Sequence, residues 1–290
     1  MSIYVDHVVG MSRTVFDNLK SLKRLKISAE TSSVIAALWD ESGSTALPSS
    51  LKSLELQLCY LKPSSFAKLL NNLSSLDTLT LRQCDTVEGP CPPISMCHLR
   101  MLKWLRIEEC DCITSFVGSE ALVSLEHMDI QSCYNLKSVP DVNDMPSLKT
   151  LWLRYCPRVL ALSSYGYQTA LKELDIRSCD GLSSLGELCG LVSLSKMRVI
   201  ECSDLVLLPN KDCFCSLELL IIEHCPQLRS LPRSGLPVSL KAFFLTGCHP
   251  ALEEQFQRKV GPDWNKADAL SGCMICTDES SEYWGNLSFC

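Results

Sequence analysis

Cysteine is the residue type in this chain with the clearest chemical potential, because it supplies 18 of the 290 residues. Cys273 and Cys276 form a C-x-x-C pair, which is a spacing used by metal and redox sites. A zinc site needs four ligands, however, and only Cys290 follows, with no histidine in the segment after Cys276. Two C-x-C pairs elsewhere fit packing beside a strand. We therefore predict no metal site and no cofactor.

Other catalytic patterns are also missing. The five histidines are scattered, and the sequence contains no H-E-x-x-H zinc motif and no G-x-S-x-G nucleophile motif. It also lacks the G-x-x-x-x-G-K-[ST] phosphate loop, so we expect no nucleotide binding. These observations predict a protein that is not an enzyme.

Charge and hydropathy narrow the class of partner. The formal net charge is −6, whereas a nucleic-acid binder normally presents a basic surface to phosphates. The apolar runs fall well short of the roughly 20 residues that a membrane span needs. The first residues lack the basic segment of a secretory signal. We expect a cytoplasmic protein with protein partners, no nucleic acid and no membrane association.

The position of the cysteines is more informative than their number. Half of them end a nine-residue motif, L-x-x-L-x-L-x-x-C, whose copies are spaced by 25, 26 and then six times 23 residues. A strict period of this size is typical of stacked coils. The copies are LKSLELQLC (51–59), LDTLTLRQC (76–84), LKWLRIEEC (102–110), LEHMDIQSC (125–133), LKTLWLRYC (148–156), LKELDIRSC (171–179), LSKMRVIEC (194–202), LELLIIEHC (217–225) and LKAFFLTGC (240–248).

Each copy predicts one short strand. Its L-x-L centre alternates apolar and polar residues, as a strand with one buried face does. The return path is too short for a regular helix with two loops, so successive strands must run parallel, about 4.8 Å apart. Equivalent residues then stack in rows, and the motif cysteines form an internal row of small buried side chains. Parallel Cβ vectors hold neighbouring Cβ atoms too far apart for a disulfide, so we expect reduced thiols.

The period divides the chain into four parts. Residues 1–50 are an N-terminal flank with one degenerate repeat, LKRLKISAE from Leu22, and an irregular insertion. Residues 51–248 are a solenoid of about nine coils. Residues 249–270 are a helical C-terminal cap, with Pro250 at a first helical position and Gly261-Pro262 as a stop. Residues 271–290 are a cysteine-containing tail that we expect to be poorly ordered.

The repeats resemble leucine-rich repeats in their cysteine form. The closing stretch GCHPALEEQFQRKVGPDWNKADAL (247–270) resembles the end of the leucine-rich-repeat domain of plant intracellular immune receptors of the coiled-coil nucleotide-binding type. The resemblance implies a horseshoe with a parallel sheet on its concave face and a mostly irregular convex side. It also implies a domain that senses a pathogen effector or a guarded host protein and restrains the receptor's nucleotide-binding domain. Since the phosphate loop is missing, we expect the chain to be a C-terminal fragment or a truncated product of such a receptor.

An alternative function remains open. A stand-alone leucine-rich-repeat adaptor, such as the substrate-recognition part of a ubiquitin ligase, would carry the same repeats. It would need an F-box-like helical bundle, of which residues 1–50 show no convincing sign.

The partner surface is predicted from repeat position. The third, fifth, seventh and eighth residues of each repeat should point away from the leucine interior and line the concave face. Tryptophan, tyrosine and arginine are the residue types that most often anchor interfaces. The competing interpretation is that these positions only keep the sheet soluble. The predicted contact residues are Trp104, Arg106, Glu108, Asp129, Gln131, Trp152, Arg154, Tyr155, Asp175, Arg177 and Arg198.

Overall fold

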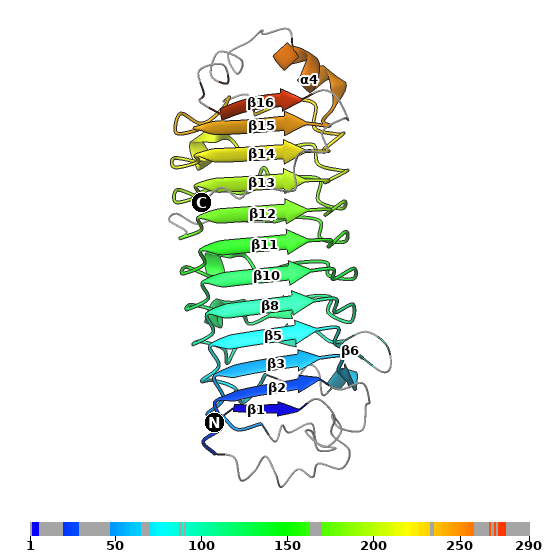
Figure 1. Cartoon of the computed structure of the whole chain (residues 1–290), viewed down its shortest axis with the longest axis vertical. Coiled ribbons are helices and arrows are strands. Elements are labelled where there is room, and N and C mark those ends of the chain that lie inside the picture. The colour runs from blue at the N-terminus through cyan, green and yellow to red at the C-terminus, as the bar shows by residue number, and fades with distance from the viewer. Residues whose placement is uncertain are drawn as a thin grey trace.

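The computed structural model describes residues 2–5, 20–28, 47–64, 70–86, 89, 91–162, 170–232, 235–257, 267, 270 and 272–276. One parallel sheet of twelve strands runs along the whole length of the molecule, and its strands lie in sequence order (Figure 1). The strands are β1 Ser2–Val5, β2 Arg24–Ser28, β3 Ser53–Gln57, β5 Thr78–Arg82, β8 Trp104–Glu108, β10 His127–Gln131, β11 Thr150–Arg154, β12 Glu173–Arg177, β13 Lys196–Ile200, β14 Leu219–Glu223, β15 Ala242–Thr246 and β16 Gly272–Cys276.

Each of the nine predicted repeats holds one strand, which spans the third to the seventh residue of its motif. The fourth and sixth residues are buried, and the flanking strand residues are at least partly exposed in most strands. Strand pairing is in register throughout, so that Leu151 pairs with Leu174 and Leu153 with Ile176. The rows predicted from the 23-residue period are therefore confirmed.

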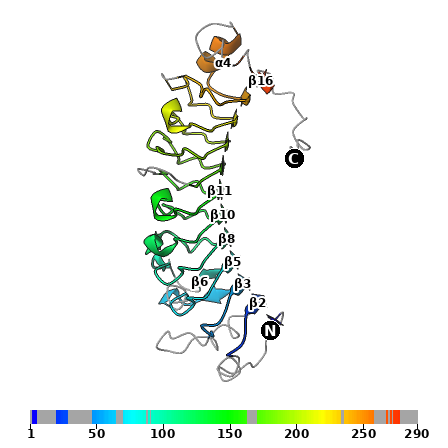
Figure 2. The same cartoon turned by 90° about the vertical axis from the view of Figure 1, so that its left-hand side faces the viewer.

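The sheet lies on the inside of a shallow curve, and the return segments lie on the outside (Figure 2). These returns hold only short elements in the described residues. Two-residue strands pair as β4 Tyr60–Leu61 with β6 Asp85–Thr86, and as β7 Ile94–Ser95 with β9 Phe116–Val117. Single 3-10 turns follow at η1 Ser119–Ala121, η2 Val142–Asp144 and η3 Lys211–Cys213. The predicted horseshoe, with a parallel sheet on its concave face and a mostly irregular convex side, is confirmed.

The motif cysteines form a buried row just past the strands. Each thiol donates a hydrogen bond to the carbonyl oxygen two residues earlier, with sulfur–oxygen distances of 3.2–3.6 Å. Burial raises the pKa of the Cys179 thiol, which favours its neutral form. The row therefore satisfies backbone carbonyls at the strand ends with a side chain small enough to stack. Its members are Cys59, Cys84, Cys110, Cys133, Cys156, Cys179, Cys202, Cys225 and Cys248.

Both ends of the sheet extend past the predicted solenoid. The degenerate repeat at Leu22 does form a coil strand, β2, with Leu25 and Ile27 buried, and β1 pairs with it further out. At the other end, β16 pairs with β15 over residues 272–276. The structure thus places a strand within residues 271–290, the tail that we expected to be poorly ordered. The search for the leucine motif missed it because Cys273 takes the register position at which the other repeats carry leucine, methionine or phenylalanine.

The predicted helical cap begins where the sequence placed it. Helix α4 spans Pro250–Gln257 and starts at the predicted proline. Leu252 and Phe256 are buried, and the Phe256 ring lies 5.7 Å from the ring of Phe243 in β15. The helix therefore covers the interior beside the last repeat. The remainder of the predicted cap to residue 270 and the insertion between β2 and residue 47 fall mostly outside the described residues.

Candidate functional site

The strands bring ten of the eleven predicted contact residues onto the concave face. The register aligns the fifth residues of successive repeats in one row and the seventh residues in another. We call strands β8 to β13 of this face the contact band. Its fifth-position row is Arg106, Asp129, Trp152, Asp175 and Arg198, and its seventh-position row includes Glu108, Gln131, Arg154 and Arg177. Trp104 is the third residue of its repeat and the first residue of β8.

Tyr155 is the exception, and its predicted place in the strand is wrong. The eighth residue of each repeat has a positive φ, which is 54° at Tyr155, so the chain leaves the strand at this point. Its N–H donates to the carbonyl of Arg177 in the next coil, at 2.8 Å. This turn could not be recognised from the sequence, because among the nine repeats only the last carries glycine at this position, Gly247. Tyr155 thus lies at the rim of the contact band, with its side chain exposed.

Asp175 is the centre of a charged cluster in the contact band. Its side chain is only 2% exposed. Arg177 donates two hydrogen bonds to it, from Nε to Oδ1 at 2.7 Å and from an NH2 group to Oδ2 at 2.9 Å. Arg154 from the neighbouring strand donates a third, to Oδ2, at 3.1 Å. The hydrogen bonds to Asp175 raise the pKa of Arg177 further.

A second charged cluster extends over strands β5, β8 and β10, next to the strand of Arg154. Arg82 and Arg106 both pair with Glu108, at 3.3 and 3.2 Å, and Arg106 also approaches Asp129 at 3.6 Å. Asp129 is 5% exposed, and its Oδ1 atom has no hydrogen-bond partner. Burial raises its pKa, although Arg106 and Arg154 oppose the effect.

Burial sets these two aspartates apart from the other predicted contact residues. A carboxylate this deeply buried cannot offer a large surface to another protein. Each one instead holds arginine side chains in place through charge-assisted hydrogen bonds or ion pairs. Asp129 and Asp175 are therefore positioning residues for the exposed cations around them.

Aromatic side chains accompany both clusters. The Trp152 ring lies under the guanidinium of Arg154, whose carbon is 4.8 Å from the ring centroid. Trp104 stacks against His127 with ring centroids 4.3 Å apart. Cation–π and ring contacts of this kind restrict large side chains on a surface. The contact band therefore presents ordered arginine and tryptophan groups.

Two charged residues of the contact band and one of its border were missed by the sequence analysis. Glu173 in β12 accepts a hydrogen bond from Arg198 at 2.7 Å, Arg82 in β5 belongs to the second cluster, and Lys196 is exposed at the start of β13. All three occupy the third or seventh position of their repeats. Applying the position rule evenly to every repeat would have found them.

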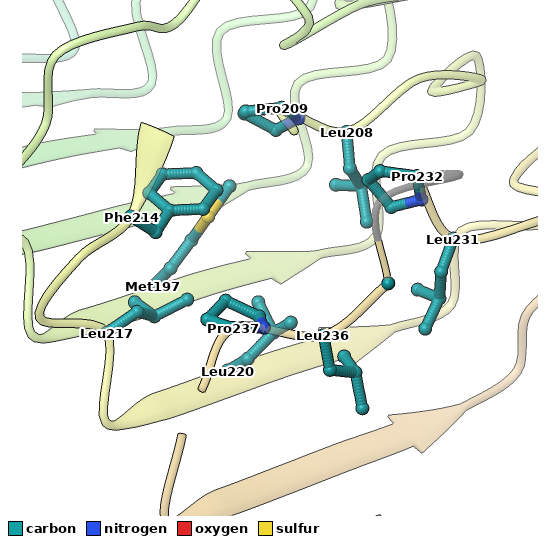
Figure 3. Close-up of a pocket in the computed structure, with 11 residues that line it drawn as sticks. Met197, Leu208, Pro209, Phe214, Leu217, Leu220, Leu231, Pro232, Leu236 and Pro237 are labelled. Atoms are coloured by element: carbon teal, nitrogen blue, oxygen red, sulfur yellow. The ribbon is translucent and has the colours of Figure 1, made fainter. Parts of the chain in front are cut away.

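One small cavity is lined by residues of β13, β14 and the segments that follow them. The cavity in Figure 3 is about 20 Å³, which is the space of a single water molecule, and apolar side chains and prolines line it. Met197 of β13, Leu220 of β14 and Phe214 are among the side chains that face it (Figure 3). Ligand pockets are usually many times larger. This cavity is an imperfection in coil-to-coil packing.

A wider groove of about 390 Å³ follows the edge where the strands end, beside Asp85, Glu109 and Asp111. Its two aspartates have structural roles. Asp85 accepts the N–H of Thr86 at 2.7 Å, and Asp111 accepts the N–H of Tyr134 from the next coil at 2.9 Å. The carboxylates at this edge thus tie turns together.

Within the described ranges, no three His, Cys, Asp or Glu side chains lie close enough together to hold a metal ion. No helix in that part of the chain is both long and apolar enough to cross a bilayer.

Comparison with known proteins found similarity only among solved structures, since no protein-family model and no curated protein matches the chain. The leucine-rich repeat domain of the type III effector XopL is 17% identical over 76% of this chain and 75% of that one, with a TM-score of 0.49. An internalin from Listeria monocytogenes is 15% identical over 80% and 76%, with a TM-score of 0.42. TLR13 in complex with single-stranded RNA is 14% identical over 83% and 42%, with a TM-score of 0.42.

With TM-scores below 0.5, these overlaps add nothing to what the sheet shows by itself. The class of protein follows from the chain's own repeats: one parallel strand per repeat, leucines stacked inside, a buried cysteine row and irregular returns. Together they define a leucine-rich-repeat solenoid.

Proposed function

We propose that the chain is a non-enzymatic protein-interaction module that binds its partner through the contact band. The observation that carries this proposal is the set of ordered arginine and tryptophan side chains on one open face, around Trp152, Arg154 and Arg177. Residues of these types dominate the binding energy of many interfaces. Solubility alone would not require arginines that are held in place by buried carboxylates.

Unsatisfied polar groups support the same face. In the described part of the chain, the buried side-chain polar atoms that have no hydrogen-bond partner all lie on strands β5 to β11 of the concave face. Some of these atoms take part in ion pairs. Buried polar groups normally find partners in a protein or in ordered water. A partner bound over this face, or ordered water beneath it, would supply such groups. These atoms are Arg82 Nε, Arg106 Nε, Glu108 Oε2, Asp129 Oδ1, Trp152 Nε1 and Arg154 Nε.

The finer proposal is that this module serves a plant disease resistance receptor in innate immunity, as the resemblance of residues 247–270 implies. In that role it would sense a pathogen effector or a guarded host protein and hold the receptor's nucleotide-binding domain inactive. The placement of α4 beside the last repeat is consistent with that resemblance. A cytoplasmic location belongs to the same proposal.

The experiment that tests the finer proposal is to sequence the transcript upstream of Met1. We expect the reading frame to continue into a domain with a phosphate loop. Stop codons in every upstream frame, together with abundant protein of this length, would refute the receptor proposal. An in-frame F-box-like bundle would instead support the ubiquitin-ligase adaptor.

The interaction surface is tested separately. The chain is co-expressed with the domain encoded upstream, and co-purification is measured for the double variant Trp152→Ala with Arg154→Gln. We expect weaker co-purification at a temperature at which the variant is still folded; its melting temperature should fall because Arg154 also pairs with the buried Asp175. Tyr134→Ala is the matched control, because Tyr134 is an exposed aromatic residue at the strand-end edge, outside the contact band. Equal losses in both variants would contradict the placement of the surface.

A further inference from the structure

We propose that Arg154 and Arg177 together bind a carboxylate side chain from an acidic segment of the partner protein. This inference rests on the proposed interaction function, and it names the chemistry of the group that the contact band recognises. It follows from the difference between the two charged clusters, from the hydrogen-bond donors that remain available and from the charge of the surrounding strands.

The two clusters differ in charge balance. In the cluster of Arg82, Arg106, Glu108 and Asp129, two guanidinium groups face two carboxylates, so the charges cancel. In the cluster around Asp175, two guanidinium groups share a single carboxylate. Counting direct ion pairs alone, the two guanidinium groups carry one positive charge more than the carboxylate they share, on adjacent strands and in register with each other. Glu223 in β14 attracts Arg177 at longer range and offsets part of this charge.

Donors also remain at this pair. A guanidinium carries five N–H groups. Arg177 uses two of them on Asp175, and Arg154 uses one. The Arg177 and Arg154 side chains are 39% and 24% exposed, so further N–H groups can reach a ligand on the concave side. The planar fork of such a group matches a carboxylate with two parallel hydrogen bonds.

The pair is held in place before any partner arrives. Asp175 fixes the end of both side chains, and the Trp152 ring supports Arg154 from below. Side chains that are already ordered lose less conformational entropy on binding. This arrangement separates Arg154 and Arg177 from ordinary surface arginines, whose ion pairs contribute little.

The surrounding strands favour an anion as well. On the concave positions of β11 to β13, four cations (Arg154, Arg177, Lys196 and Arg198) stand against two carboxylates (Glu173 and Asp175). This surplus of positive charge occurs in a chain whose formal net charge is −6. Since opposite potentials steer partners together, an acidic protein segment fits this part of the contact band.

The test uses the full chain and a capped hexaglutamate peptide at low ionic strength. Binding is followed by NMR through the indole N–H of Trp152, with tryptophan labelled with nitrogen-15 and the signal assigned through Trp152→Phe. The Trp152 signal should shift saturably because Arg154 lies against its ring, whereas the Trp104 signal should move little. Capped hexaglutamine should cause no saturable shift.

The decisive variant is Arg177→Lys, which keeps the positive charge, the salt bridge and the fold but loses the planar fork. We expect hexaglutamate to bind about 5- to 10-fold more weakly to it, since a bidentate contact becomes a single one. The control is Arg82→Lys in the balanced cluster, where the side chain is 36% exposed and thus comparable with that of Arg177. Its affinity should stay within about 1.5-fold of wild type.

Several outcomes would overturn the proposal. Equal weakening in Arg177→Lys and Arg82→Lys would mean general electrostatic attraction, and an unchanged affinity in Arg177→Lys would exclude the fork. Inorganic phosphate that binds more tightly than hexaglutamate would indicate a phosphate site instead. None of these results would decide the proposed interaction function, which is tested independently by the co-purification of the Trp152 and Arg154 double variant.

Discussion

Replacing Arg177 by methionine tests how much the ion pair with the buried Asp175 contributes to stability. The substitution removes two hydrogen bonds to a carboxylate that is 2% exposed and leaves it with Arg154 alone. Removing one partner of a buried ion pair costs roughly 3–5 kcal/mol. Because Arg154 still donates one hydrogen bond, we place the loss in the free energy of unfolding at the lower end, about 3 kcal/mol.

Arg198→Met is the matched control on the next strand. It also removes one guanidinium, but the Glu173 side chain left behind is 24% exposed and can be solvated by water. Partly exposed ion pairs contribute at most about 1 kcal/mol. The two variants should therefore differ by about 2 kcal/mol, which is nearly a thirtyfold difference in the unfolding equilibrium.

Urea unfolding at pH 7, followed by far-UV circular dichroism, measures this difference. Amide hydrogen exchange across β11 to β13 should be measured together with urea unfolding, because repeat proteins can open locally. Adding Asp175→Asn to Arg177→Met should restore part of the lost stability, because no buried charge remains unpaired. Equal costs for Arg177→Met and Arg198→Met, within about 0.5 kcal/mol, would refute the reasoning.

The remaining predictions concern one buried carboxylate, one pair of thiols and one turn position. Burial raises the pKa of Asp129 above its ordinary value of 3.8, so the folded state holds the proton more tightly and stability from this group falls as the pH rises above that value. In urea unfolding, Asp129→Asn should therefore be at least as stable as wild type at pH 7. Its free energy of unfolding should also fall less than that of wild type between pH 4 and pH 7. A variant that is clearly less stable than wild type at pH 7 would contradict this prediction. Diamide should oxidise Cys189 and Cys213 to a disulfide before any cysteine of the buried row, because their sulfur atoms lie 3.3 Å apart near the surface. Peptide mapping by mass spectrometry measures the order of oxidation, and earlier oxidation of the buried row would contradict this prediction. Ser132 has φ 53°, so Ser132→Val should cost about 1–2 kcal/mol while Ser132→Gly should be tolerated; similar melting temperatures for both would argue against the turn.

The predictability of the fold came from repetition. Leu151 and Leu174 could be placed inside, in register, from the 23-residue interval alone, because a side chain that recurs at the same phase of every coil must stack on its counterpart. The cysteine row followed for the same reason, and so did the start of the cap at Pro250. The strand β16 could not be found in this way, since Cys273 takes a register position that a leucine search does not recognise.

The candidate site was only half predictable. Position in the repeat placed Trp152, Arg154 and Arg177 on the concave face, and this was correct. The repeat position also placed Asp175 on this face, but it could not show that arginines of two strands would hydrogen-bond to Asp175 and bury it. It also took Tyr155 for a strand residue, because a left-handed turn leaves no mark in the sequence unless glycine occupies it.

The sequence by itself determined the class of protein, since a short period of leucines and cysteines can bury its apolar side chains only by stacking coils into a parallel sheet. It also determined which residues share the concave face. Only the tertiary structure decided which charges on that face are compensated, because ion pairs form between neighbouring coils and depend on side-chain burial and reach. That difference separates the balanced cluster at Arg106 from the pair at Arg154 and Arg177, whose two guanidinium groups share a single carboxylate.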